Sequence, residues 1–438
     1  MALGLAVRLA FVLIKQSQVV LRTSDNYWYH MQAKLVADGR GFLDPFLLRN
    51  AGIEAPGAQH PPGFVLFLTV LDLLGIDTPQ GQRIAMTFVG TASILVIALL
   101  ARRLASPRVG IVAAFLAALY PNLWINDGML LVETVYILAI AVTLLLTYRY
   151  LERPRWGDLA GLSAALTVAA MTRPESLVLF GVVVTPLVLT RTSLRWSQRW
   201  AQLAVAAIVP IAAFAPWVTY NLARFDSPVT ISTGAGQTLA AGYCDSTFSG
   251  RLVGWYDVQC VLDRWDGEPG EDPTVRDAAL RRGALDYLSE HRGEMPRVMA
   301  IRVGRVWHLY GAEQSLGLDG WIESRSGGVP SGDRTVVAGA LWSYFALVPL
   351  AVAGGIVLWR RRVPIWPLMV QPALVTVVAA MTFGITRYRA GAEITLVVLA
   401  AVAIVAAVEW VLRSRAVPSG PDQHTRGVTT DGDRTSGT

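Results

Sequence analysis

Charged residues are scarce in this chain of 438 residues. Asp, Glu, Lys and Arg make up 16% of it, where about 25% is usual for a globular protein, and only Lys15 and Lys34 are lysines. A soluble protein of this length would need two or three cores and a charged surface. The shortage therefore argues against a soluble chain. With only two cysteines, the chain is not a disulfide scaffold, and its composition excludes collagen and disorder.

Apolar residues are abundant instead. Removing the 13 Tyr (about 3%) from the 53% hydrophobic residues and adding the 39 Gly (about 9%) gives roughly 59%, against a globular norm of about 45–50%. An integral membrane protein is the class that remains. The net charge of +6 comes from arginines, most of which flank apolar runs, so it indicates membrane topology rather than a nucleic-acid partner.

Ten apolar runs approach the roughly 20 residues that cross a bilayer. The first carries Arg8 and Lys15 and lacks a small-residue cleavage site, so we expect a span rather than a signal peptide. This run begins almost at Met1, so we expect the given sequence to be slightly truncated at its N-terminus. The run from Phe64 to Gly75 is too short to cross and predicts a helix at the interface. The predicted spans are about 3–22, 84–103, 107–125, 129–150, 157–172, 175–190, 201–221, 336–359, 364–383 and 391–413.

Arginines in the short loops predict the orientation, because such residues are retained on the cytoplasmic side. Alternate loops carry them, and with an even number of spans both termini are then cytoplasmic. The protein is expected in the cell membrane, with the opposite loops facing outward. The cytoplasmic set contains Arg102, Arg103, Arg108, Arg149, Arg153, Arg155, Arg191, Arg195, Arg199, Arg360, Arg361, Arg362, Arg413 and Arg415.

The fold class predicted is an all-α polytopic membrane protein with about ten transmembrane helices, helices in its first outward loop and a small extracytoplasmic domain. Both cysteines, Cys244 and Cys260, fall in that domain, where disulfides persist. We expect them to be bridged; two free thiols are the alternative. The predicted parts are a transmembrane catalytic module at 1–221 with the outward loop 23–83, an extracytoplasmic domain at 222–335, transmembrane helices at 336–413 and a disordered tail at 414–438.

Charges in very short outward loops are a second signal. Asp127, Arg173 with Glu175, and Arg387 with Arg389 all lie in such loops, and Glu133 is about a turn into its span. Helix-end snorkelling is one explanation. Ionisable residues near membrane depth are otherwise a functional hypothesis.

The first outward loop has its own pattern. After Asp25, the residues Tyr29, Ala33 and Ala37 recur at helical spacing, so the carboxylate is predicted at or near the start of a short helix. Taken alone, Asp25 would be an N-cap. About 35 residues later the loop continues with His60-Pro61-Pro62.

Together these features resemble the GT-C membrane glycosyltransferases, in particular the family 39 branch of protein O-mannosyltransferases and lipid A aminoarabinose transferases. The resemblance covers most of the span-bearing chain, from Arg8 to about residue 413. Its carriers are Asp25 with Tyr29 and Ala33, Gly39 and Gly41-Phe42, His60-Pro61-Pro62, Arg83, Tyr120-Pro121 with Asn126-Asp127, Glu133, Thr172-Arg173-Pro174-Glu175, and Arg387-Tyr388-Arg389 followed by Ala392-Glu393.

This resemblance implies transfer of one sugar from a polyprenyl-phosphate donor to an acceptor hydroxyl on the extracytoplasmic side. Asp25 takes the role of catalytic base, and His60, just before the Pro pair, that of a donor-phosphate contact. Many relatives have an acidic residue where Asn26 stands, and the aminoarabinose branch has an Arg in place of Trp28, so the donor sugar stays open.

The chemistry supports these roles. Inverting transfer needs one carboxylate to deprotonate the hydroxyl, while the phosphate leaving group needs cations rather than an acid. Arginine grips phosphate oxygens through two donors. We therefore expect Arg173, Arg387 and Arg389 to bind the donor phosphate. The expected supporting or substrate-binding residues are Tyr29, Asp127, Glu133 and Glu175.

No cofactor is expected. A divalent cation among Asp25, Asp127 and Glu133 is conceivable, but the resembled branches need none, and the five histidines have no zinc spacing. The expected partners are a polyprenyl-phosphate-linked sugar, membrane lipid, and an acceptor protein, glycolipid or polysaccharide. The alternative function is a polytopic transporter or flippase of lipid-linked sugar. Against it, the charged candidates share one face, and no inverted repeat of hydropathy is found.

Overall fold

The computed structural model describes residues 1–438 except 18, 22–23, 266, 326–333 and 416–438. Within that part the chain is helical, with no strand and one isolated β-bridge, between Leu43 and Pro56. The predicted all-α class is confirmed. Most of the predicted tail at 414–438 lies outside the described residues.

Within the described part of the chain, five helices are long and apolar enough to cross a membrane, and a bent pair could form a sixth span. A protein with these helices is a membrane protein. The predicted number of ten spans stays a prediction, because several predicted runs form shorter or broken helices. The five long helices are α5 (Pro79–Leu104), α8 (Glu133–Glu152), α11 (Trp196–Leu222), α18 (Arg334–Arg360) and α20 (Glu393–Arg415).

The shorter apolar helices differ most from the predicted runs. The helix predicted at 3–22 ends at Lys15. The run predicted at 107–125 is bent by 70° at Pro121, because proline disfavours helical geometry in the residue before it. These elements are α1 (Ala2–Ala10), η1 (Phe11–Lys15), α6 (Pro107–Leu119), α7 (Pro121–Trp124), η2 (Ile125–Gly128), α9 (Trp156–Thr172), η3 (Pro174–Leu177), η4 (Phe180–Val184), α10 (Thr185–Leu189) and α19 (Trp366–Met381).

The loop at 23–83 holds three helices, α2 (Asp25–Ala37), α3 (Pro45–Ala51) and α4 (Pro62–Leu73). Helix α2 begins at Asp25, as its helical spacing predicts. It packs on α4, where the Thr69 hydroxyl donates to the Ala33 carbonyl oxygen at 3.3 Å. Helix α4 is apolar but has only 12 residues, too few to cross a bilayer.

The described part of the 222–335 segment contains several helices and small hydrophobic clusters that include Leu280 and Val298. Cys244 and Cys260 are joined there by a disulfide. The helices, with the short η5 that follows α19, are α12 (Ala235–Gly242), α13 (Asp245–Phe248), α14 (Gln259–Leu262), α15 (Pro273–Glu290), α16 (Met295–Val306), α17 (Ala312–Arg325) and η5 (Thr386–Gly391).

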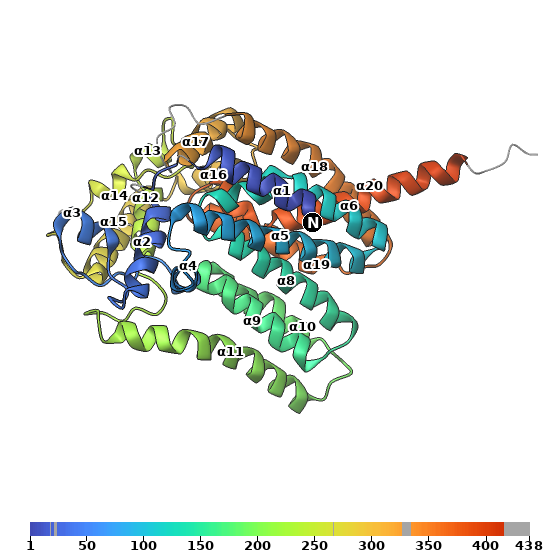
Figure 1. Cartoon of the computed structure of the whole chain (residues 1–438), viewed down its shortest axis with the longest axis horizontal. Helices are drawn as coiled ribbons and strands as arrows, with labels where there is room; N and C mark the ends of the chain where they lie inside the picture. The colour runs from blue at the N-terminus through green and yellow to red at the C-terminus, as the bar shows by residue number, and fades with distance from the viewer. Residues whose placement is uncertain (18, 22–23, 266, 326–333, 416–438) are drawn as a thin grey trace, which may run out of the picture.

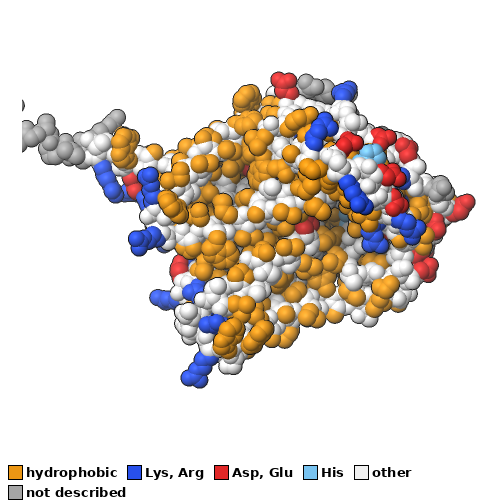
Figure 2. All heavy atoms as spheres, turned by 180° about the vertical axis from the view of Figure 1, so that it is seen from behind, with side chains coloured by type: hydrophobic (Ala, Val, Ile, Leu, Met, Phe, Trp, Pro, Cys, Tyr) orange, Lys and Arg blue, Asp and Glu red, His pale blue; other side chains and the backbone are white. Residues whose placement is uncertain are grey.

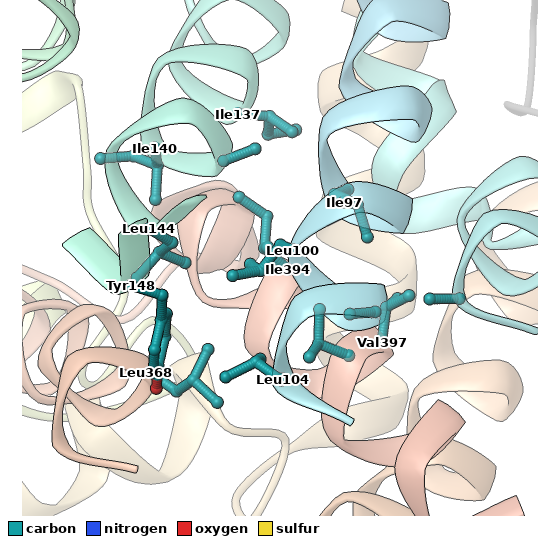
Figure 3. Packing of buried hydrophobic residues seen from close by; sticks show 14 of the residues in the cluster. Ile97, Leu100, Leu104, Ile137, Ile140, Leu144, Tyr148, Leu368, Ile394 and Val397 are labelled. Carbon is teal, nitrogen blue, oxygen red and sulfur yellow. The ribbon is translucent and has the colours of Figure 1, made fainter. Parts of the chain in front are cut away.

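The main core lies where α5, α8, α19 and α20 meet. Figure 3 shows Leu100, Ile140, Leu368 and Ile394 from these four helices pointing toward one another. All four side chains are fully buried. This packing holds the starts of α8 and α20, which adjoin the site, in fixed positions.

The two ends of the bundle differ. Helices α2, α3, α12, α14 and α15 gather at one end, and α20 projects from the other (Figure 1). Figure 2 shows an apolar middle, with mostly basic side chains toward the end from which α20 projects and mixed charges at the opposite end. An apolar belt between two charged ends is typical of a protein that spans a bilayer.

The disulfide gives a first testable prediction. Its cysteines are 16 residues apart in sequence, and closing a loop of that length stabilises a fold by roughly 3 kcal/mol through chain entropy. We expect Cys244→Ser with Cys260→Ser to lower the free energy of unfolding of this segment by about that amount. Chemical denaturation of the purified protein measures the loss. A loss that dithiothreitol reproduces in wild type would assign it to the bond, and an unchanged midpoint would contradict the prediction.

Candidate active site

Asp25 is the first residue of α2, and the N-cap position belongs to Ser24. Its carboxylate faces two basic side chains. One oxygen lies 3.5 Å from Nη1 of Arg387, and the other lies 3.8 Å from Nε2 of His60. The side chain is 40% exposed. Both contacts are long for charge-assisted hydrogen bonds, so the Asp25 carboxylate keeps room to accept a further proton donor.

Glu133 joins two arginines that are far apart in sequence. One of its oxygens accepts from Nη2 of Arg173 at 2.7 Å and from Nε of Arg387 at 2.9 Å. Glu133 is fully buried, at the start of α8. Arg173 comes from the end of α9, and Arg387 from η5. Two like charges lie side by side here because one carboxylate holds both.

Arg173 is held on several sides. Its guanidinium lies over the rings of Tyr136 and Tyr388, 5.3 Å from each centroid, and Nη1 lies 3.4 Å from a Glu175 oxygen. Burial tends to lower the pKa of Arg387, but the Glu133 and Asp25 carboxylates raise it above its ordinary value. Glu133 and Glu175 likewise raise the pKa of Arg173. Both guanidiniums therefore stay charged.

His60 reaches the site because the start of α4 packs tightly on the end of α9. A Cβ on Gly63 would lie 2.7 Å from the Met171 carbonyl oxygen, so only glycine fits. The His60 ring packs on Tyr29, with centroids 4.7 Å apart. Burial lowers the pKa of His60, as does Arg387, against the opposing effect of Asp25. The predicted basic contact is thus a neutral imidazole at neutral pH, able to donate a hydrogen bond but not a charge.

The structure therefore brings seven of the predicted residues into one group at the end of the bundle. Burial and the Asp25 charge raise the pKa of Tyr29, so its hydroxyl stays protonated. The group, called the Asp25 cluster below, consists of Asp25, Tyr29, His60, Glu133, Arg173, Glu175 and Arg387.

Asp127 lies elsewhere. It forms an ion pair with Arg8 of α1 at 2.9 Å and accepts a hydrogen bond from Thr134 at 2.8 Å. Both members of the pair are fully buried, and Gly90 of α5 makes space, since a Cβ there would lie 2.3 Å from an Asp127 oxygen. None of its described contacts is with the Asp25 cluster, so Asp127 anchors α1 to the bent segment.

This buried pair gives a second prediction. Removing one partner leaves an unpaired charge in an apolar surrounding, which costs about 3–5 kcal/mol. We expect Arg8→Leu and Asp127→Leu each to lower the thermal stability of the detergent-solubilised protein strongly. The double variant removes both charges and should recover most of the loss. Losses that simply add in the double variant would contradict the pairing.

Arg389 is also placed differently from its prediction. It forms an ion pair with Glu393 at 2.5 Å, donates to the Val306 carbonyl oxygen at 2.9 Å and lies over the Tyr344 ring. The Tyr120 hydroxyl donates to the other Glu393 oxygen at 2.6 Å. With 1% exposure, Arg389 is buried where η5 meets α16, α18 and the start of α20.

Several residues of these networks were not predicted. Arg8 carried a signal, because it is a charge inside an apolar run, but no local pattern links it to Asp127. Tyr388 lies between Arg387 and Arg389 in sequence, and its ring packs against the guanidinium of Arg173. As to metals, within the described ranges no three or more His, Cys, Asp or Glu side chains are grouped so as to hold an ion.

Comparisons with known proteins bear on the family and the fold. Residues 59–220 match the family described as dolichyl-phosphate-mannose-protein mannosyltransferase. This range contains His60, Glu133 and Arg173. No curated protein matches the chain in sequence.

Solved structures extend the likeness to nearly the whole chain. The oligosaccharyltransferase of Archaeoglobus fulgidus in its apo form has a TM-score of 0.53 at 14% identity, over 95% of this chain and 51% of that chain. Its complex with zinc and sulfate has a TM-score of 0.52 at 13% identity, over 94% and 49%. The present chain resembles the GT-C membrane glycosyltransferases.

That resemblance, predicted from the motifs, is thus confirmed at the level of fold. The chain spans about half the length of the oligosaccharyltransferase it matches. ArnT from Cupriavidus metallidurans, bound to undecaprenyl phosphate, matches over 92% of this chain and 77% of that chain, at 14% identity and a TM-score of 0.43.

Proposed function

We propose that this protein is an inverting glycosyltransferase that moves a sugar from a polyprenyl-phosphate donor to an acceptor hydroxyl on the extracytoplasmic side of the membrane. Asp25 is the base that takes the proton of the attacking hydroxyl. Arg173 and Arg387 bind the donor phosphate, and His60 donates a hydrogen bond to it.

The observation that carries this proposal is the position of an uncommitted carboxylate beside two fixed guanidiniums. Among the residues that the structure describes, the Asp25 carboxylate has side-chain contacts of 3.5 and 3.8 Å only, whereas Asp127 and Glu393 are held by partners within 3.0 Å. A general base needs free lone pairs at hydrogen-bond reach of its substrate. Of these three carboxylates, Asp25 is the one that meets this requirement.

The arginines suit the leaving group. As the bond between the anomeric carbon and the phosphate oxygen breaks, charge grows on the phosphate, and preorganised cations stabilise it. Because Glu133 fixes both guanidiniums, they need little rearrangement when the donor binds. A phosphate that takes over the Nη1 group of Arg387 would also release Asp25 to accept the proton.

The length of α9 supports the proposed side of the membrane. Helix α9 has 17 residues between the arginine-rich loop at 153–155 and Arg173, a rise of about 25 Å. The Asp25 cluster is therefore at the opposite face from the arginine-rich loops, which the positive-inside rule assigns to the cytoplasm. Exposed Leu66, Val70 and Leu73 on α4 offer the adjoining apolar surface that a polyprenyl chain needs.

The acceptor is a protein, a glycolipid or a polysaccharide, and the described helices of the 222–335 segment are proposed to select it. The matched family is described by its protein acceptor. We therefore place a protein hydroxyl first among the three.

Reconstituted transfer tests the function directly. Purified protein in liposomes receives a panel of radiolabelled polyprenyl-phosphate sugars, and nucleotide sugars serve as matched donors without the lipid. We expect transfer of label to envelope acceptors from a lipid donor only, with inversion at the anomeric carbon. Transfer from nucleotide sugars, retention of configuration, or labelled lipid merely moving across the bilayer would each overturn the proposal.

A further inference from the structure

A cavity adjoins the Asp25 cluster at Arg387. It has a volume of about 80 Å³ and is lined by the bent segment, by α17 and α18, and by η5. That space holds several water-sized groups. Its walls are largely apolar, and its polar lining residues are Asn122, Asn126, His308, Thr386, Arg387 and Glu393.

His308 is the unusual member of this lining. It is 7% exposed, and its Nδ1 atom is buried without a hydrogen-bond partner among the described residues. Its backbone φ is +54°, a left-handed conformation that non-glycine residues rarely adopt. Strained backbone and unsatisfied buried polar atoms are both typical of ligand sites.

The conformation of His308 is fixed by its neighbours. Its ring packs on Tyr344, with centroids 5.5 Å apart, and the Tyr344 hydroxyl donates to the Trp307 carbonyl oxygen at 3.1 Å. Burial, together with the charge of Arg389, lowers the pKa of His308 to about 3. The imidazole is therefore neutral in this structure, with one nitrogen to donate and one to accept.

The other polar groups favour a ligand that carries hydroxyls. The Nδ2 group of Asn122 donates to the Tyr120 hydroxyl and the Ala340 carbonyl oxygen, and that of Asn126 donates to the Asn122 carbonyl oxygen. In these contacts Asn122 uses both N–H groups and has only its amide oxygen left to accept, whereas Asn126 keeps its amide oxygen and one N–H. Hydroxyl groups can donate to these oxygens and accept from or donate to His308.

Arg387 links the cavity to the chemistry, because it lines the cavity and also contacts Asp25. The acceptor hydroxyl must approach the half-exposed side of Asp25. The donor sugar, which is covalently attached to the phosphate, is then expected next to Arg387. The cavity lies on that side, because Arg387 lines it.

We propose that this cavity holds the donor sugar and that His308 determines specificity by hydrogen-bonding one of its hydroxyl groups. The inference rests on the proposed function and adds to it the place where the sugar is recognised. It also gives the 222–335 segment, from which His308 comes, a part in donor choice.

Equilibrium binding tests this inference without turnover. The affinity of the full-length protein is measured for bare undecaprenyl phosphate and for its mannosyl, glucosyl, galactosyl and arabinosyl derivatives. Wild type should bind one sugar-bearing lipid more tightly than the bare lipid phosphate. His308→Gly removes the ring while suiting the positive φ. It should reduce that preference about tenfold, the value of one good hydrogen bond, and leave the affinity for the bare lipid unchanged.

Two further variants complete the test. Asn126→Ala should also reduce the preference, and it provides the answer if His308→Gly fails to fold. His291→Gln is the matched control, because His291 stacks on Tyr287 within the same segment and does not line the cavity. An unchanged preference in both His308→Gly and Asn126→Ala overturns the sugar site and leaves the proposed function standing. If wild type binds no lipid phosphate at all, the proposed function fails and this inference with it.

Discussion

Replacing Asp25 by Asn is expected to lower the rate of sugar transfer by about 10²–10⁴-fold, the usual contribution of a general base. The substitution keeps the shape of the side chain and removes only its ability to take a proton. Binding of the lipid-phosphate donor should persist or become tighter, because the negative charge beside Arg387 is lost. Single-turnover transfer of a radiolabelled polyprenyl-phosphate sugar measures the rate, and donor binding is measured separately.

A matched control lies on the same helix. Asp38 follows the last turn of α2 and is exposed, about 20 Å from Asp25 along the helix. Asp38→Asn makes the same chemical change and should leave the transfer rate unchanged. Equal rates for wild type and Asp25→Asn would rule out Asp25 as the base. A loss of donor binding in Asp25→Asn would instead indicate a role in shaping the site.

Local sequence patterns predicted the parts of this site that depend on local geometry. The helical spacing after Asp25 located the start of α2, and the apolar run from Phe64 to Gly75 predicted a short helix where α4 lies. Short loops between apolar runs brought Arg173 and Arg387 to one face, because a run of membrane-spanning length fixes the distance between its ends. These inferences need only the chain's own periodicity.

Local sequence patterns did not predict which charged side chains would pair with one another. Arg387 and Arg389 lie two residues apart on η5, a 3₁₀ helix with three residues per turn, so their side chains point in different directions. Which of the two meets Asp25 depends on how η5 docks between α8 and α20. Asp127 was assigned to the site from its loop, but its partner Arg8 is 119 residues away in sequence, and no short-range pattern connects them.

Glu133 links the stability of the fold to the proposed phosphate site. It is fully buried and holds both arginines of the site. Glu133→Gln leaves two neighbouring guanidiniums without their shared carboxylate, a change that costs about 3–5 kcal/mol for a buried pair. We expect a large fall in melting temperature in detergent.

Added lipid phosphate separates a phosphate site from a purely structural ion pair. If Arg173 and Arg387 bind the donor phosphate, undecaprenyl phosphate supplies the missing negative charge and should raise the melting temperature of Glu133→Gln more than that of wild type. Glu175→Gln is the control, because Glu175 contacts the same Arg173 at 3.4 Å but is 27% exposed. A partly exposed pair contributes at most about 1 kcal/mol, so its melting temperature should change little. A Glu133→Gln protein that the lipid does not stabilise would show that the two arginines hold the fold together without meeting the donor.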